Sequence, residues 1–275
     1  MTYRLIALDL DGTLLDSQLQ IRPRTIEALK RAREQGVQAM IVTGRHHSAA
    51  YAYWHQLGLD LPTICCNGAY IYDFKTGKAL AGDPFPSAEA RTFLKLARAH
   101  PAHLMIYTDT AMVYEQGDAP LPEGMGDWAA RLPENLRPRL ASVTSFNDLI
   151  DSQAVIWKFL AVPDNDKVME SLLNTANAQG FYCVRSGGNR IDISRAGNSK
   201  GKRLAEFIEQ RGISPDQVIA FGDQDNDREM LQLAGLGVAM GNAHQDVRTS
   251  ADWVTGPNDD DGIGDALQRF VLTAT

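Results

Sequence analysis

The sequence predicts an α/β fold in which a doubly wound parallel sheet forms the core and a second α/β unit is inserted into it. Three observations support this prediction. Short apolar runs recur along the chain, and most of them end in a polar residue, as expected of buried parallel strands with a binding site at their carboxyl ends. Segments with helical spacing separate several of these runs. The chain also changes character after Pro84, and the first pattern resumes near residue 191.

The first apolar run, residues 5–8, leads directly into Asp9, Asp11 and Gly12. Two carboxylates at positions i and i+2 can divide the work of a reaction, because one can attack or hold a metal while the other moves protons. The glycine allows the backbone to turn tightly after them. The alternative is an ordinary turn, since Asp and Gly are common turn residues.

The later runs extend the same pattern. A helix is expected over residues 22–35, because Pro23 stands in its first turn and Gly36 follows its end. We expect further strands at 39–42, 63–66, 218–221, 237–240 and 253–254, and helices at 200–211 and 227–234. If the strands are parallel neighbours, the polar residues at their ends converge on one crevice: Asp9, Asp11, Thr43, Asn67 and Asp223.

We interpret residues 84–190 as the inserted α/β cap and residues 1–83 and 191–275 as the core. The expected elements around the insert are helices at 88–99 and 167–179, strands at 104–107, 112–114, 155–162, 181–185 and 190–194, and a stretch rich in Pro, Gly and Arg from 117 to 138. Hinges between the two units are expected at 82–84 and 194–199. The insert would then close over the crevice and limit access of water.

Composition narrows the possible functions. The chain has 275 residues, of which 44% are hydrophobic, so it can bury a sizeable core. Its formal charge of −7 argues against nucleic acid or an anionic membrane surface as a partner. The three cysteines, Cys65, Cys66 and Cys183, show no disulfide framework, and no run of 18 apolar residues occurs. We therefore expect a soluble, cytoplasmic protein, either a monomer or a small homo-oligomer, with Cys65 and Cys66 packed in a strand.

Four segments resemble the ordered motifs of the haloacid dehalogenase (HAD) superfamily of phosphohydrolases: residues 9–13, 43–45, 199–201 and 222–227. The Asn67-Gly68 step, the long insert and the Ile191–Ile193 strand before Lys200 resemble the Cof-type branch, subfamily IIB, whose members carry a large α/β cap. Residues 43–47 and 64–68 are most similar to bacterial pyridoxal phosphate and sugar phosphate phosphatases. The resemblance implies a Rossmann-like core that hydrolyses phosphomonoesters.

The resemblance also implies roles for the acidic residues. Asp9 would be the nucleophile that becomes an aspartyl phosphate, and Asp11 would protonate the leaving alcohol and then activate water. A phosphate dianion beside carboxylates requires a cation, and oxygen ligands suit Mg²⁺. The implied ligands are Asp9, the backbone carbonyl of Asp11, and Asp223.

The remaining motif residues would bind phosphate: Leu10, Thr43, Gly44, Arg45, Asn67, Lys200 and Asn226. Lys200 would neutralise the nucleophile and the phosphate together, but a lysine that opens a helix is more often solvated. Arg45 has two possible roles, to hold phosphate or to pair with an acid on the next helix. Asn226 and Asp227 are expected to orient Lys200 and the metal waters, with helix capping as the alternative.

The cap is expected to select the substrate, and its candidate residues each have a structural alternative. These candidates are Trp157, Lys158, Arg185 and Asn189. Outside the cap, His46 and His47 would reach substrate or cap a helix in solvent. Tyr51, Tyr53 and Trp54 would stack on a ring or simply pack. The acidic run 259–261 lacks the spacing of a calcium loop and is expected to be solvated.

Taken with the resemblance, these residues predict a Mg²⁺-dependent hydrolase of small phosphorylated metabolites. Pyridoxal 5′-phosphate is the leading substrate, followed by sugar phosphates such as erythrose 4-phosphate. Two alternatives remain open. A phosphomutase would use the same acids but return the phosphoryl group to its substrate, and a sensing module would bind the metabolite without turnover.

Overall fold

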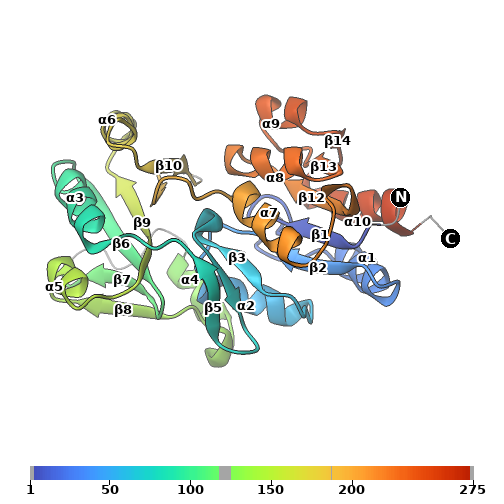
Figure 1. Ribbon diagram of the computed structural model, residues 1–275, viewed down its shortest axis with the longest axis horizontal. Coiled ribbons are helices and arrows are strands. Elements are labelled where there is room, and N and C mark those ends of the chain that lie inside the picture. Colours follow the sequence, from blue (N-terminus) through green and yellow to red (C-terminus); the bar gives the residue numbers. More distant parts are fainter. Residues whose placement is uncertain (1–2, 118–124, 187, 273–275) are drawn as a thin grey trace.

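The computed structural model describes residues 3–117, 125–186 and 188–272, and two large sheets organise them (Figure 1). The first is a five-stranded parallel sheet with the order β14-β13-β12-β1-β2. Its strands are β1 (Leu5–Leu8), β2 (Gln38–Ile41), β12 (Val218–Gly222), β13 (Leu236–Ala239) and β14 (Trp253–Val254). β1 pairs with β2 on one side and with β12 on the other. The strand order therefore reverses beside β1, which is where ligands bind in such sheets.

Both faces of this sheet are covered because consecutive residues of its strands are apolar and point alternately to the two faces. Ile6 and Leu8 pack into a cluster with helices α1 (Pro23–Glu34) and α10 (Gly262–Leu267). Leu5 and Ala7 face the other way, toward α7 (Lys200–Gln210) and α8 (Arg228–Leu233). Short helices α2 (His47–Gln56) and α9 (Gln245–Ser250) complete this part. The predicted doubly wound α/β core is confirmed.

The apolar run at 63–66 lies in a different sheet from the parallel sheet in which we predicted it. β3 (Thr63–Cys65) pairs antiparallel with β4 (Tyr70–Asp73), which pairs with β5 (Lys78–Gly82), a hairpin that we did not predict. A single parallel bridge, Val42 to Ile64, connects β3 to the end of β2. Cys66 leaves the strand with a positive φ, so only Cys65 packs within it.

The second sheet has six strands in the order β10-β11-β9-β6-β7-β8, and only β7 and β8 are parallel. They are β6 (Ala102–Thr108), β7 (Met112–Glu115), β8 (Leu140–Val143), β9 (Ile156–Pro163), β10 (Tyr182–Arg185) and β11 (Ile191–Ser194). Helices α3 (Ser87–Ala97), α5 (Phe146–Asp151) and α6 (Asp166–Ala178) lie on the side away from the parallel sheet (Figure 1). The opposite side, with α4 (Met125–Arg131), packs against the core. Part of the predicted stretch 117–138 lies outside the described residues.

The pairing of strand β11 changes one predicted boundary between the cap and the core. We placed residue 191 in the core, but β11 forms its hydrogen bonds with β9 and β10 of the six-stranded sheet. We therefore propose that the cap comprises residues 84–194. The two segments expected to be hinges are hydrogen-bonded to each other, because Asn198 donates to the carbonyl of Asp83 at 3.1 Å. Arg203 bridges them as well, since it donates to Asp83 at 2.6 Å and to Asn198 at 3.4 Å.

No helix among the described residues has the length and apolar character needed to span a membrane.

Candidate active site

The two acids of the first motif stand at the carboxyl end of β1, next to the end of β12. Asp9 is buried, and its N–H donates to the carbonyl of Phe221, so backbone pairing fixes its position. Asp223 follows β12 and accepts a hydrogen bond from the hydroxyl of Thr13 at 2.8 Å. Gly12 makes this approach possible, because a Cβ there would lie 2.3 Å from an oxygen of Asp223 and its φ is +79°. The predicted convergence of distant strand ends is therefore present for these residues.

Lys200 lies in the centre of this acidic cluster and is only 1% exposed. Its Nζ is 2.6 Å from Asp9 Oδ1 and 2.7 Å from Asp227 Oδ1. Ser199 caps helix α7 by accepting the N–H of Lys202 at 3.0 Å, which directs the first residue of the helix toward the sheet. The solvated alternative for Lys200 is excluded, and Asp227 contacts the lysine as expected.

The cluster has too little positive charge for its carboxylates. Ligand oxygens of Asp9, Asp223 and Asp227 lie within 4.8 Å of one another, and all three residues are buried. Burial and the neighbouring carboxylate of Asp227 raise the pKa of Asp9 well above its usual value, and they raise that of Asp223 to about 6. Three carboxylates and one ammonium have a formal charge of minus two. One divalent cation would cancel this charge, and the all-oxygen donor set fits Mg²⁺.

Asp11 is turned away from this cluster and binds Arg45. The guanidinium donates through Nε to Oδ2 at 2.7 Å and through Nη2 to Oδ1 at 2.5 Å, which is the bidentate arrangement. Loss of surrounding water favours the neutral acid, but Arg45 outweighs it and holds the pKa of Asp11 below its usual value. Arg45 therefore pairs with an acid of the first motif and not with one on the next helix, and its alternative role of holding phosphate stays a prediction.

The Thr43 and Asn67 loops meet behind the pocket. The Thr43 hydroxyl accepts the N–H of Arg45 at 3.1 Å, and Asn67 has a left-handed backbone with a φ of 55°. Asn226 donates to Asn67 Oδ1 at 2.9 Å, whereas the Lys200 ammonium donates to Asp9 and Asp227, so the role of Asn226 toward Lys200 and the metal waters stays a prediction. The Leu10 side chain is fully buried in the core, which leaves only its backbone for phosphate.

A second buried ion pair connects the cap to these loops. Lys158 of β9 lies 2.8 Å from Asp192 Oδ1 of β11 and donates to the carbonyl of Gly44 at 2.7 Å. Asn67 donates to the other oxygen of Asp192 at 2.9 Å. Burial acts to lower the pKa of Lys158, but Asp192 outweighs it and the pKa is raised. Lys158 was a candidate from the sequence, whereas Asp192 was expected only as part of a strand.

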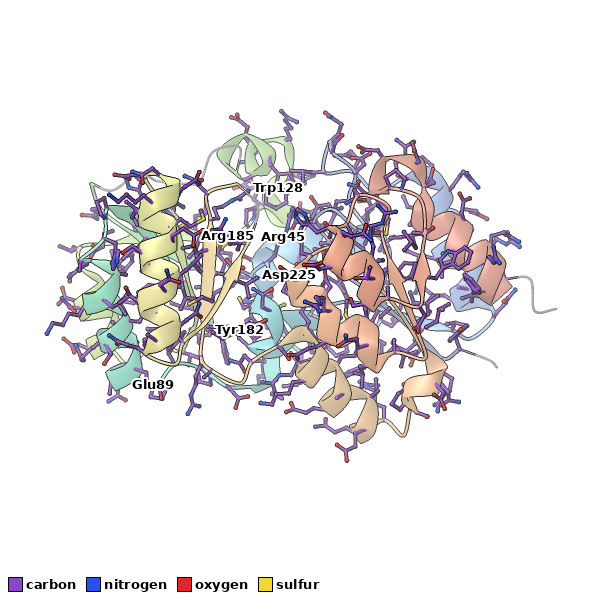
Figure 2. All side chains as sticks on the ribbon, turned by 90° about the horizontal axis from the view of Figure 1, so that it is seen from above. Arg45, Glu89, Trp128, Tyr182, Arg185 and Asp225 are labelled. Carbon is purple, nitrogen blue, oxygen red and sulfur yellow. The ribbon has the colours of Figure 1, made fainter. Side chains whose placement is uncertain are left out.

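A pocket of about 340 Å³ opens between the two sheets in front of Asp9. Six predicted site residues line it: Asp9, Asp11, Gly44, Arg45, Lys200 and Asn226. Lys158 and Arg185 of the cap also line it. Arg185, which is labelled in Figure 2, forms an ion pair with Glu170. Leu10, Thr43, Asn67 and Asp223 are not among its lining residues.

The other candidates have mainly structural roles. Trp157 is buried and stacks on Tyr70 with ring centroids 4.4 Å apart, and Asn189 donates to the carbonyl of Pro163. His46 and His47 are buried, so the solvent-exposed alternative is wrong; His46 caps α2, lines the pocket and binds the carbonyl of Thr108 at 2.8 Å. Asp261 is also buried and binds Thr25, so the predicted loop at 259–261 is only partly solvated.

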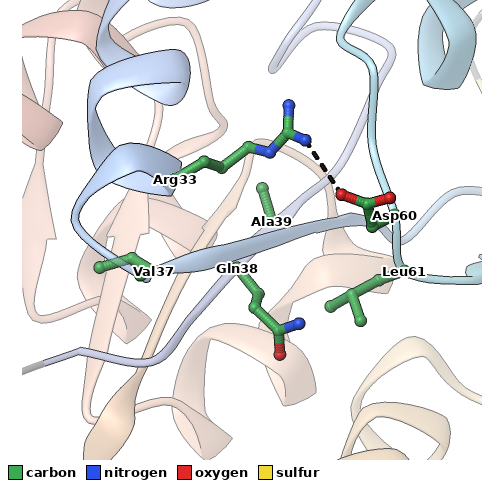
Figure 3. A pocket seen from close by; sticks show the side chains of 7 residues that line it. Arg33, Val37, Gln38, Ala39, Asp60 and Leu61 are labelled. Carbon is green, nitrogen blue, oxygen red and sulfur yellow. Dashed lines mark hydrogen bonds and ion pairs between the residues drawn. The ribbon is translucent and has the colours of Figure 1, made fainter.

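A second pocket, of about 380 Å³, lies at the opposite end of the parallel sheet, where β2 begins (Figure 3). Its charged lining residues, Arg33 and Asp60, pair with each other at 3.2 Å. Because these two charges neutralise each other, this pocket lacks the unbalanced carboxylates found at Asp9.

Comparisons with known proteins agree with the geometry. A family model described as haloacid dehalogenase-like hydrolase matches residues 6–267. The chain is 42% identical over 277 residues to pyridoxal phosphate phosphatase YbhA of Escherichia coli, covering 99% of this chain and 100% of that protein. It is 27% identical to the 5-amino-6-(5-phospho-D-ribitylamino)uracil phosphatase YitU of Bacillus subtilis, with 97% of each chain covered.

Solved structures match over nearly the whole chain as well. A haloacid dehalogenase-like hydrolase from Bacillus subtilis superposes with a TM-score of 0.85 at 26% identity, covering 98% of this chain and 100% of that one. The sugar phosphatase BT4131, of HAD subclass IIB, superposes with a TM-score of 0.79 at 26% identity, covering 97% of this chain and 98% of that one.

Proposed function

The chain belongs to the haloacid dehalogenase-like hydrolase family and is a phosphatase of that family; from this premise we propose that it hydrolyses small phosphorylated metabolites with Mg²⁺ through a phospho-aspartate on Asp9. The observation that carries the proposal is the position of Asp9. It is buried at the end of β1, bound by Lys200, and it faces a pocket that Asp11 also lines.

Asp9 has one oxygen bound to Lys200 Nζ, so we assign the attack on phosphorus to the other oxygen, Oδ2. As the new Asp9 O–P bond forms, the bond from phosphorus to the leaving oxygen breaks. Asp11 is ionised while Arg45 holds it, so we propose that on substrate binding it separates from Arg45, takes up a proton from solvent and gives that proton to the leaving oxygen. Asp11 then takes a proton from water. The water oxygen attacks phosphorus, and the Asp9 carboxylate is released with inorganic phosphate.

Positive charge around the phosphate comes from Lys200 and Arg45. Lys200 keeps its proton because Asp227 and Asp9 outweigh the effect of burial and raise its pKa. We propose that Asp9, Asp223 and the carbonyl of Asp11 hold Mg²⁺, with Asp227 beside them. When bound, the ion would supply charge against the phosphate dianion.

Pyridoxal 5′-phosphate is the leading substrate, because the relative with 42% identity over its full length is named for that activity. Sugar phosphates are the second candidates, since a structural neighbour is described as a sugar phosphatase.

The test is phosphate release from a panel of pyridoxal 5′-phosphate, sugar phosphates and FMN with Mg²⁺, using Asp9→Asn as the blank. We expect release from a few members and none with the variant. Binding without release from any member would favour a mutase or a sensor instead. Borohydride reduction of the enzyme during turnover should convert Asp9 to homoserine, which mass spectrometry detects; substantial turnover by Asp9→Asn would contradict its role as nucleophile.

A further inference from the structure

Part of the lining of the pocket in front of Asp9 is apolar, and we call these residues its apolar end. The polar lining holds Asp9, Asp11 and Lys200, and on the cap side Lys158, Asp192, Arg185, Ser186 and Arg190. The apolar lining residues are Leu19, Ala49, Met112, Trp128 and Leu160. They come from the core loop, from α2, from α4, and from the side of the cap sheet that packs against the core. This apolar end is where the part of the substrate beyond the phosphate would lie.

Trp128 is the largest of these side chains, and its neighbours fix its position. It lies on α4 and is only 9% exposed. Its ring stacks on Tyr53 with centroids 6.2 Å apart and an interplanar angle of 14°, and the Arg45 guanidinium lies 4.8 Å from its centroid. Figure 2 shows Trp128 beside Arg45 between the two halves of the molecule. Because Arg45 holds Asp11, the indole stands next to the group that would face the leaving oxygen.

The chemistry of this end distinguishes two kinds of leaving group. A sugar has a hydroxyl on nearly every carbon, and each hydroxyl buried against Leu, Met or Trp loses its hydrogen bonds to water without replacement. A flat ring loses little when it leaves water and gains contact with an indole and a thioether. Of the polar cap residues in the lining, Lys158 and Asp192 bind each other and Arg185 pairs with Glu170. The apolar residues beside them therefore favour a ring over a polyol.

We propose that Trp128, with Met112 and Leu160, receives the leaving group as a planar ring and makes the enzyme selective for phosphate esters of aromatic alcohols over sugar phosphates. This inference rests on the proposed phosphatase function and specifies its substrate class. Trp128 is the specificity-determining residue, because an aromatic contact of this kind changes affinity by up to about tenfold.

The test compares benzyl phosphate with ribose 5-phosphate, each at saturating Mg²⁺. Both are esters of a primary alcohol, so the leaving oxygens are similar and the difference lies in the attached group. The variants are Trp128→Leu and the conservative Trp128→Phe. Trp253→Leu is the matched control, because Trp253 packs against Phe270 at the far edge of the parallel sheet and does not line the pocket.

We expect the wild-type enzyme to have a higher kcat/KM for benzyl phosphate, by about tenfold or more. Trp128→Leu should lower the ratio of the two kcat/KM values about tenfold, mainly through a higher KM for benzyl phosphate. Trp128→Phe should retain most of the ratio, and Trp253→Leu all of it.

Two results would overturn the inference while the phosphatase function stands. Equal losses for both substrates in Trp128→Leu would show that the indole only supports Arg45 and Asp11. A wild-type preference for ribose 5-phosphate would show that the apolar end does not receive the leaving group. Absence of phosphate release from both compounds and from pyridoxal 5′-phosphate would overturn the proposed function and this inference together.

Discussion

Replacing Lys200 by methionine should destabilise the metal-free protein strongly, because it leaves buried carboxylates without a counter-charge. The ammonium lies 2.6 Å from Asp9 and 2.7 Å from Asp227. Charges about 2.7 Å apart attract by about 6 kcal/mol at an effective dielectric constant of about 20, and desolvation offsets part of this. Since removing one partner of a buried pair typically costs about 3–5 kcal/mol, we expect a loss of that size in the free energy of unfolding.

The loss in the free energy of unfolding of Lys200→Met should increase with pH. The pKa of Asp223 is already raised to about 6 and that of Asp9 is raised well above its usual value, both first by burial. A carboxyl whose pKa is raised by folding stabilises the folded state at low pH, where it is protonated, and destabilises it as the pH rises through the raised pKa. Lys200→Met should therefore lose the full amount at pH 8 and less at pH 5.

Urea unfolding followed by tryptophan fluorescence, in EDTA at both pH values, measures these losses. Lys202→Met is the matched control on the same helix, because the Lys202 side chain is 46% exposed and its partners lie at 3.4 and 3.7 Å. Such surface pairs contribute about 0–1 kcal/mol. With Mg²⁺ present, Lys200→Met should also lower kcat by about 10²–10³. Equal losses in the two variants, or a loss that does not change with pH, would refute the assigned role of Lys200.

Three further predictions concern the metal, a glycine and a histidine. EDTA should stop phosphate release and Mg²⁺ should restore it, and the Mg²⁺ affinity measured by calorimetry should fall below about pH 6, where Asp223 holds a proton; a constant affinity from pH 5 to 8 would contradict this. Gly12→Ala should abolish Mg²⁺ binding because its Cβ would lie 2.3 Å from Asp223, whereas Gly36→Ala, with a similar φ of +86° and no atom within 4 Å, should keep it. Burial lowers the pKa of His46 to about 4, so its neutral ring contributes stability above pH 6.5 that is lost toward pH 4. His47, whose pKa burial lowers to about 2, adds a loss of its own, so thermal unfolding should show a loss over this range that is about 3 kcal/mol smaller in His46→Gln than in the wild type.

The core could be predicted from sequence because its determinants are local. Each strand of the parallel sheet is a short apolar run, and Asp9 and Asp223 follow such runs directly. Parallel neighbours bring these ends together whatever the length of chain between them. The β4–β5 hairpin was missed because its turn lacks an Asn-Gly or Asp-Gly signal, and β5 is largely exposed.

The buried polar contacts could not be predicted in the same way. Lys158 stands within an apolar strand and Asp192 within another, and only the pairing of β9 with β11 brings them together. Likewise, Asn226 and Asn67 are 159 residues apart, and their hydrogen bond depends on two loop conformations, one of them left-handed. Secondary-structure propensity and hydrophobic periodicity do not predict contacts of this kind, because either partner alone looks like a surface residue.

The two buried charge clusters differ in net charge, and this difference distinguishes a structural role from a chemical one. Lys158 and Asp192 balance each other one to one. Their remaining contacts are a backbone carbonyl, an amide and the Tyr107 ring, so this pair needs no further charge and can position the cap against the Gly44 loop. The cluster around Asp9 has three carboxylates for one ammonium. Such an excess is costly in a buried site and is a feature of functional centres.

A bound cation would offset this excess of negative charge, and an incoming phosphate dianion would add to it. We therefore expect phosphate to bind well only when the cation is present. Isothermal titration of the protein with inorganic phosphate, with and without Mg²⁺, measures this coupling, and equal affinities would mean that the excess charge has another origin.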